Sequence, residues 1–208
     1  MELKIYNVGF LGINTYLLLD NDSKEAVIID LGGDYKPIKK DIDKSGYKIK
    51  FILNTHGHFD HIYGEVQFQK DFPEIPIYMH KDDMIHIDHI DVEMALWGFN
   101  GQVKPVKIAE FIDENSELSI GCNKIQVLHT PGHSNGSLSY YTDGKLFSGD
   151  ALFQRSIGRT DLYDGDYNKL ISSIKTKLLT LDDDTIVFPG HGPSTTIGEE
   201  KKYNTYLR

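Results

Sequence analysis

The sequence contains a single cysteine, Cys122, among 208 residues. One cysteine cannot form an internal disulfide, which is typical of a reducing compartment, so we expect a cytoplasmic protein. We expect the Cys122 side chain to be a small buried apolar group rather than a reactive thiol.

Long apolar runs are also missing. No stretch of about 18 apolar residues occurs, which excludes a membrane-spanning helix. Met1 to Tyr6 carry no basic region, and Asn14, Thr15 and Tyr16 interrupt the apolar stretch that follows, so we expect no signal peptide. The sequence therefore predicts no membrane partner.

Basic residues are in the minority. The chain has 22 Lys and Arg against 31 Asp and Glu, a formal charge of −9. Because phosphate binding needs a basic surface, this balance disfavours a nucleic-acid partner. No glycine-rich phosphate loop occurs, and the segment 132–136 places His before Ser, so the G-x-S-x-G nucleophile elbow is absent. We therefore expect a small-molecule substrate and chemistry without a protein nucleophile.

What the sequence does contain is a cluster of metal-binding side chains directly after the apolar run 51–53. Its four members within six positions are His56, His58, Asp60 and His61. His56 and His58 project to one side of an extended segment and can reach one ion, whereas Asp60 and His61 fall beyond that reach and can serve a second. Imidazole and carboxylate ligands suit zinc, iron or manganese rather than calcium. Four donors in six positions disfavour the alternative, a polar loop with solvated histidines.

This His-x-His-x-Asp-His pattern resembles the signature of the metallo-β-lactamase superfamily, which needs a further His, Asp and His downstream. The chain supplies them as His133, Asp150 and His191, each after an apolar run that ends in a glycine-containing loop. The resemblance spans essentially the whole chain. It implies a first ion held by His56, His58 and His133, a second held by Asp60, His61 and His191, and Asp150 as the bridge between them.

We expect a single domain over residues 1–208, because 39% hydrophobic content can supply one substantial core and no stretch has linker composition. A strands-then-helix pattern occurs twice, which suggests pseudo-repeat halves of about 1–110 and 111–208. The resemblance implies an α/β fold, the αββα four-layer sandwich: two facing mixed sheets, helices on both outer faces and metals at one open edge. Strands are expected at 3–6, 14–19, 26–29, 50–54, 76–80, 117–120, 124–129, 138–141, 146–148 and 185–188. Helices are expected at 37–45, 61–70, from 81 onward, 166–179 and 197–207.

Three features have two interpretations each. Asp30, in the turn 30–34, either supports the metal ligands from behind or is an ordinary turn residue. The segment 85–106 is expected to cap the site with aromatic side chains; the alternative is a packed helix and loop with a buried Trp97. His86 and His89 have helical spacing and could bind a metal, but we assign them no role.

The chemistry follows from a pair of ions that share a water. Two ions about 3.5–4 Å apart lower the pKa of that water and provide a bridging hydroxide that attacks a carbonyl. Asp60 and Asp150 are the catalytic candidates. The segments 150–161 and 190–200 resemble glyoxalase II-like short hydroxyacylglutathione hydrolases, which implies a thioester substrate such as S-lactoylglutathione. Arg159 is then expected to bind a carboxylate of the thiol carrier, or else to pair with Asp161.

Other functions remain open. Pro193 stands shortly after the last ligand histidine, where glyoxalase II enzymes carry Tyr, and the sequence stops without their basic C-terminal domain. We therefore expect either a different thiol carrier or looser selectivity. The main rival is a persulfide dioxygenase with one iron on His56, His133 and Asp150. A lactonase is a further alternative, whereas charge disfavours a nuclease and the complete ligand set disfavours a non-catalytic scaffold. His58, where flavodiiron proteins carry Glu, excludes that branch. The sequence does not reveal the oligomeric state.

Overall fold

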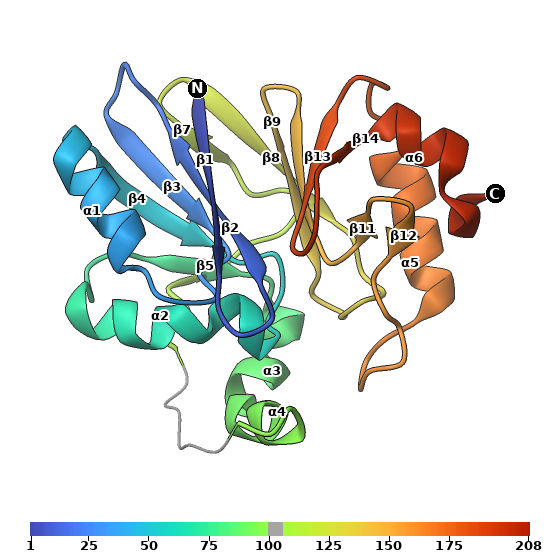
Figure 1. Ribbon diagram of the computed structural model, residues 1–208, viewed down its shortest axis with the longest axis horizontal. Helices are drawn as coiled ribbons and strands as arrows, with labels where there is room; N and C mark the ends of the chain where they lie inside the picture. The colour runs from blue at the N-terminus through green and yellow to red at the C-terminus, as the bar shows by residue number, and fades with distance from the viewer. Residues whose placement is uncertain (100–105) are drawn as a thin grey trace.

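The computed structural model describes residues 1–99 and 106–208. Two six-stranded sheets face each other, with α1 and α2 beside the first sheet and α5 and α6 beside the second (Figure 1). The expected αββα sandwich is confirmed. Part of the expected cap, residues 100–105, lies outside the described residues.

The first sheet has the order β1-β2-β3-β4-β5-β6. Its first three strands are antiparallel and the rest run parallel from β3 onward. Parallel neighbours need crossover connections, which helices provide here. The strands are β1 (Glu2–Val8), β2 (Ile13–Leu19), β3 (Glu25–Ile29), β4 (Lys48–Leu53), β5 (Ile77–Met79) and β6 (Glu110–Phe111). The crossovers carry α1 (Lys36–Ser45), α2 (Phe59–Asp71), the 3-10 turn η1 (Lys81–Asp83), α3 (Met84–Asp88) and α4 (Ile90–Leu96).

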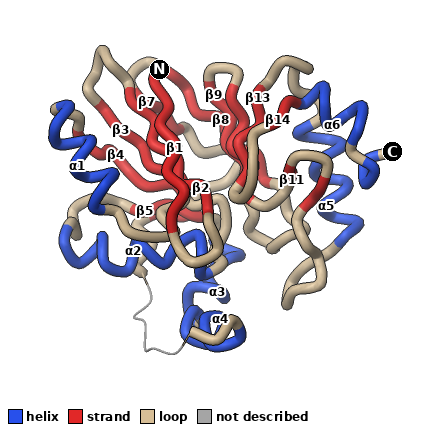
Figure 2. Tube along the Cα trace, viewed as in Figure 1, coloured by secondary structure: helices blue, strands red, loops and turns tan. Residues whose placement is uncertain are grey.

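The second sheet has the order β14-β13-β10-β9-β8-β7, with β10 and β13 parallel and the other pairs antiparallel. Figure 2 shows its strands in red, with α6 beside β14. Its strands are β7 (Leu118–Ile120), β8 (Asn123–His129), β9 (Leu138–Thr142), β10 (Lys145–Gly149), β13 (Ile186–Pro189) and β14 (Thr195–Thr196). A small hairpin, β11 (Leu152–Phe153) and β12 (Ser156–Ile157), follows β10. The helices are α5 (Tyr167–Ser173), which continues into a π-helical turn (Ile174–Leu178), α6 (Ile197–Tyr203) and a 3-10 turn (Thr205–Leu207).

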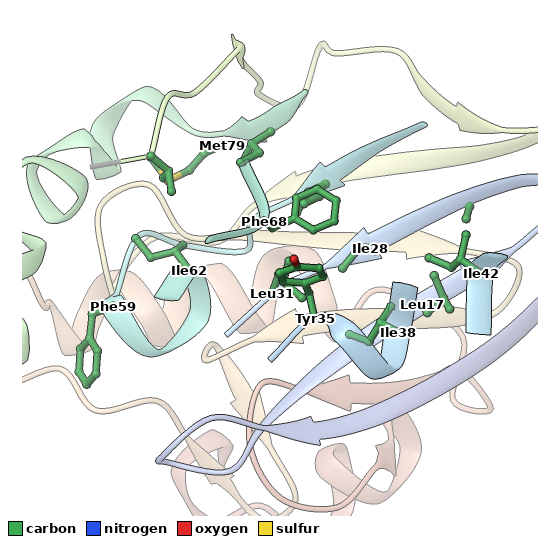
Figure 3. Packing of buried hydrophobic residues seen from close by; sticks show 14 of the residues in the cluster. Leu17, Ile28, Leu31, Tyr35, Ile38, Ile42, Phe59, Ile62, Phe68 and Met79 are labelled. Atoms are coloured by element: carbon green, nitrogen blue, oxygen red, sulfur yellow. The ribbon is translucent and has the colours of Figure 1, made fainter. Parts of the chain in front are cut away.

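Alternation along the strands fills both faces of the first sheet. In β2, Leu17 points toward the helices whereas Leu18 points into the space between the sheets. Figure 3 shows the outer cluster, in which Leu17 and Ile28 meet Ile38 and Ile42 of α1. A third cluster joins the second sheet to α5 and α6. The central strands β2 and β3 are buried almost throughout because both of their faces are covered.

Some local expectations need correction. Cys122 is exposed, not buried, because it lies in the tight turn between β7 and β8, where Gly121 has φ +54°. The helix expected at 197–207 is interrupted at Asn204, whose backbone is extended and whose side chain caps the 3-10 turn. Among the described residues, no helix has the length and apolar character needed to cross a membrane.

Candidate metal centre

The expected ligands all follow the carboxyl ends of strands. His56 follows β4, His58 stands at the N-cap of α2, and the first turn of α2 carries Asp60 and His61. The second sheet contributes the remaining three from the loops after β8, β10 and β13, which are His133, Asp150 and His191. The structure brings all seven residues together at one edge of the sandwich.

Two triads with metal-ligand geometry share this edge. His56, His58 and His133 form one, and Asp60, His61 and His191 form the other; in each, the donor atoms lie within 4.8 Å of one another. Asp150 lies between them. Its Oδ2 is 3.7 Å from His133 Nε2 and 3.7 Å from His191 Nε2, and its Oδ1 is 3.4 Å from His61 Nε2. This placement suits a carboxylate that bridges two ions.

Backbone hydrogen bonds between the sheets fix the ligand loops relative to each other. Leu138 N donates to Thr55 O at 2.7 Å, and the buried Tyr140 hydroxyl donates to Asn54 O at 2.6 Å. On the other side, Asn14 N donates to Gly190 O at 2.7 Å. The loops before His56 and His191 are therefore anchored to the opposite sheet.

The ring nitrogens that face away from the centre are held by fixed acceptors. His133 Nδ1 donates to the Arg159 carbonyl at 2.8 Å, and His61 Nδ1 donates to Asp30 Oδ2 at 3.0 Å. These bonds place a hydrogen on Nδ1 of both rings, so Nε2 is the nitrogen that faces the centre, where His133 Nε2 lies 2.9 Å from His58 Nδ1.

Asp30 supports a second histidine indirectly. Thr55 Oγ1 donates to Asp30 Oδ2 at 2.7 Å, and can therefore accept from His56 Nδ1 at 3.0 Å. Thr55 N donates to Asp30 Oδ1 at 2.7 Å. Asp30 is fully buried and adopts φ +55°, a conformation uncommon for residues other than glycine. Of the two interpretations of Asp30, the structure shows the supporting one.

The residues present fit a metal site. His56 Nε2, His61 Nε2 and Asp150 Oδ1 are buried and have no hydrogen-bond partner. Unpaired buried polar atoms are costly, and three of them that converge on one point indicate a missing ligand. Gly190 keeps the space open, because a Cβ there would collide with Asp150 Oδ1 and His61 Cε1.

Burial and neighbouring charges set the protonation of the centre. Burial, followed by the neighbouring histidines, lowers the pKa of His56 and His58 well below the usual value, so both rings are neutral, as metal binding requires. Burial opposes ionisation of Asp150, yet His61, His133 and His191 together hold its pKa below the usual value. Burial also lowers the pKa of His61, but Asp150, Asp30 and Asp60 outweigh it and raise that pKa well above normal. These carboxylates therefore favour a proton on His61 in the metal-free centre, and a metal ion bound there would have to displace it.

A cavity of about 340 Å³ opens above the centre. Besides five of the metal-site residues, it is lined by His86, Glu93 and Arg159 and by six apolar residues, Leu11, Phe59, Leu96, Trp97, Leu162 and Tyr163. Arg159 pairs with Asp161 through two bonds of 2.8 and 2.9 Å, so the ion-pair alternative is present in the structure, although Arg159 also faces the cavity. Trp97 is half-exposed, which contradicts the alternative of a buried Trp97.

Two further groups have contacts that the sequence analysis did not predict. His86 is buried, its Nδ1 bonds Glu93 of α4, its Nε2 lies 3.4 Å from Asp164 Oδ1, and its ring packs 4.6 Å from that of His58. Burial lowers the pKa of His86, but the bonds to Asp164 and Glu93 outweigh this and raise it to about 10. His89, in contrast, is exposed.

Asp83, the second group, is a buried carboxylate in η1. It accepts Gly57 N at 2.9 Å, Gly136 N at 2.5 Å and Ser134 Oγ at 2.8 Å. It therefore ties η1 to the loops that carry His58 and His133. Its partners lie far away in the sequence, so no local pattern could have indicated this role.

The fold and the site together define an αββα protein with a His/Asp metal centre. The profile described as the metallo-beta-lactamase superfamily matches residues 8–191, and the chain belongs to that superfamily. It is 36% identical to the hydroxyacylglutathione hydrolase GloC of Haemophilus influenzae, over 100% of this chain and 98% of that protein. The crystal structure of BLEG-1 B3 metallo-beta-lactamase matches with a TM-score of 0.89 and 41% identity over 99% of both chains. TTHA1623 in a di-iron-bound form matches with a TM-score of 0.87 and 34% identity, over 98% of this chain and 100% of that one.

Proposed function

We propose that the protein is a dinuclear metal-dependent thioesterase of the hydroxyacylglutathione hydrolase type. The observation that carries this proposal is the pair of triads joined by Asp150 on the floor of an open cavity. The similarity to GloC supports the thioester as substrate, and the di-iron form of TTHA1623 supports two ions.

In this proposal His56, His58 and His133 would hold the first ion, Asp60, His61 and His191 would hold the second, and Asp150, between the two sets, would serve both. The bound divalent ions, zinc in the simplest case and iron or manganese otherwise, would supply hydroxide at neutral pH and polarise the substrate carbonyl. Asp30 keeps His61 and His56 oriented through the bonds described above. Asp60 Oδ2 lies 3.2 Å from His191 Nε2, so both donor atoms face the second position.

Arg159 binds the acidic end of the thiol carrier. Its side chain is about half-exposed and its present partner, Asp161, is 71% exposed. Exposed ion pairs contribute on the order of 0–1 kcal/mol, so a substrate carboxylate can displace Asp161 at little cost.

The test is turnover of an acyl-thioester panel that includes S-lactoylglutathione, with protein loaded with zinc, manganese or iron. We expect hydrolysis by the wild-type chain and a loss of at least about 100-fold in Asp150→Ala, because the bridging carboxylate is gone. Asp184→Asn, an exposed change far from the site, should retain full activity. If no metal form hydrolyses any member of the panel, the proposal is wrong.

The likeness to BLEG-1 favours β-lactam hydrolysis as a second candidate, since the same attack opens a strained amide. A penicillin and a lactone in the same panel measure this directly. Turnover of a β-lactam with higher kcat/KM than every thioester would replace the thioesterase assignment.

A further inference from the structure

We propose that the rim of the cavity binds a bulky apolar acyl group of the substrate, an aliphatic chain or an aromatic ring rather than a small hydroxyacyl group. This inference rests on the proposed thioesterase function and names its substrate class. The apolar rim consists of Leu11, Phe59, Leu96, Trp97, Leu162 and Tyr163.

Large apolar side chains of the rim are exposed to solvent. Leu96 is 83% exposed, Tyr163 85% and Trp97 49%. Single exposed apolar residues are ordinary, but a group of them from separate segments around one cavity mouth marks a binding surface. Here the β1–β2 loop, α4 and the loop before α5 all contribute.

The apolar surface runs from the metal ligands outward. Phe59 stands between His58 and Asp60 in the chain and is buried. Its ring lies 6.4 Å from Trp97 and 5.9 Å from Phe99, which in turn packs 4.5 Å from Phe10. Phe59 and Trp97 both line the cavity, so an acyl group whose carbonyl lies over the centre meets aromatic side chains as it extends outward.

The two sides of the rim are held in place before any ligand binds. Glu93 of α4 bonds His86, and His86 approaches Asp164 on the opposite loop at 3.4 Å. This chain of contacts places α4, which carries Leu96, beside the loop that carries Tyr163. A preformed apolar site binds an apolar group without the entropy cost of ordering itself.

The polar residues that line the cavity belong to groups other than the apolar rim. Apart from Arg159, the polar residues of the lining belong to the metal centre or to the His86–Glu93 pair. Arg159 supplies the single positive charge of the lining outside these groups, which suits the acidic carrier at the other end of the thioester. A volume of about 340 Å³ is near the lower end of ligand sites, which favours one compact chain or ring.

Trp97 offers a direct probe, because it is the only tryptophan of the chain. We would titrate the metal-loaded protein with S-alkyl thioethers, methyl through octyl, of glutathione and of mercaptoacetate, and follow Trp97 fluorescence. These compounds carry no cleavable carbonyl. We expect affinity to rise by about fourfold per methylene, the factor to which about 0.8 kcal/mol for each buried CH₂ converts, until the rim is filled. Equal affinity across both series overturns the proposal.

Variants locate the effect. Leu96→Ser and Tyr163→Ala should each reduce the octyl-to-methyl affinity ratio several-fold at unchanged metal content. Tyr206→Ala, which removes an exposed aromatic outside the cavity lining, should leave the ratio unchanged. If the wild-type chain dimerises and Leu96→Ser makes it a monomer, the rim is a self-association surface and the proposal is wrong.

The two hypotheses fail separately. Length-dependent binding without turnover of any thioester would keep the apolar site and reject the thioesterase. A second outcome is turnover of S-lactoylglutathione together with an affinity that does not depend on alkyl-chain length and equal kcat/KM for octanoyl and lactoyl thioesters. That outcome would keep the thioesterase and reject the apolar acyl group.

Discussion

Asp30 shows how one buried side chain sets the geometry of two ligands. Both of its oxygens only accept, and Oδ2 receives hydrogen bonds from His61 Nδ1 and Thr55 Oγ1 at once. An acceptor at this point forces both rings to present Nε2 to the centre. The same residue holds a left-handed backbone conformation that asparagine also tolerates.

The substitution Asp30→Asn therefore changes the hydrogen bonding without a backbone penalty. With Oδ1 still bonded to Thr55 N, the amide places a donor opposite His61 Nδ1 and favours the wrong tautomer. We expect metal affinity to fall about 10- to 100-fold, measured by competition with a chromogenic chelator, while the far-UV circular dichroism stays unchanged. Asp22→Asn, on the exposed β2–β3 turn, serves as control. Wild-type affinity in Asp30→Asn would show that the bond to His61 does not position the ring.

Glu65 makes a prediction about pH. It is completely buried in α2, it bonds Asn54 Nδ2 at 3.1 Å, and burial raises its pKa well above the usual value. The folded chain therefore keeps a proton on Glu65 that the unfolded chain releases above about pH 4.3. Because of this difference, the free energy of unfolding falls as pH rises, by at most about 1.4 kcal/mol per pH unit. Glu65→Gln has no proton to lose. In metal-free protein, urea denaturation should show that the free energy of unfolding of Glu65→Gln rises relative to that of the wild type between pH 5 and pH 8. A difference that stays constant over this range would contradict the raised pKa.

The sequence predicted the residues with local signatures and missed those without one. All seven expected ligands meet because each stands at a fixed place after a strand, which a motif can reveal. The support from Asp30 was foreseen only as one of two options, since a turn aspartate gives the same local pattern. Asp83 and Asp164 act through partners far away in the chain, and no spacing rule indicates such contacts. His86 was noted for its helical spacing, but its contact with Asp164 has no local signal.

At the scale of elements, η1 connects the two ligand loops through Asp83. The carboxylate satisfies two backbone donors and the Ser134 hydroxyl, and burial raises its pKa although these bonds oppose the shift. Gly57 and Gly136 leave no room for a side chain at this junction, because a Cβ on either would contact Asp83.

Asp83→Ala should loosen this junction. Three buried donors lose their acceptor, and we expect a loss of about 2–4 kcal/mol in the free energy of unfolding, measured by urea denaturation of the metal-free chain. Asp83→Asn, which restores one acceptor, should recover part of it. The exposed Asp82→Ala is the matched neighbour and should cost less than about 0.5 kcal/mol. Equal stability of Asp83→Ala and Asp82→Ala would show that Asp83 does not stabilise the connection between the two ligand loops.

The elements that were predicted well are the ones with a long apolar pattern. α1 begins with Pro37 in its first turn and ends before Gly46, which has φ +70°, as its sequence indicates. The strands β6, β11, β12 and β14 have two residues each, too short for any alternation to register. The π-helical turn after α5 also lacks a sequence signal, because its apolar residues continue the helical period.

At the scale of the whole molecule, the contact between the two sheets could not be predicted from sequence patterns. Apolar residues of both sheets, such as Val27 and Tyr140, share one cluster, yet composition gives no pairing partner for either. The sandwich was expected from resemblance alone. The prediction of one domain over residues 1–208 stays a prediction, as do the cytoplasmic location and the absence of nucleic-acid and membrane partners.

Because each sheet contributes ligands to both triads, the number of ions bound per chain tests the assembled centre. We expect close to two ions per chain by elemental analysis of protein purified without added metal. His61→Ala should leave about one, because it removes a donor of the Asp60–His61–His191 triad and spares the other. His89→Ala, an exposed histidine outside both triads, should leave two. A single iron in the wild type, with unchanged content in His61→Ala, would instead indicate the mononuclear centre of His56, His133 and Asp150, and oxygen uptake with glutathione persulfide would then decide between dioxygenase and hydrolase.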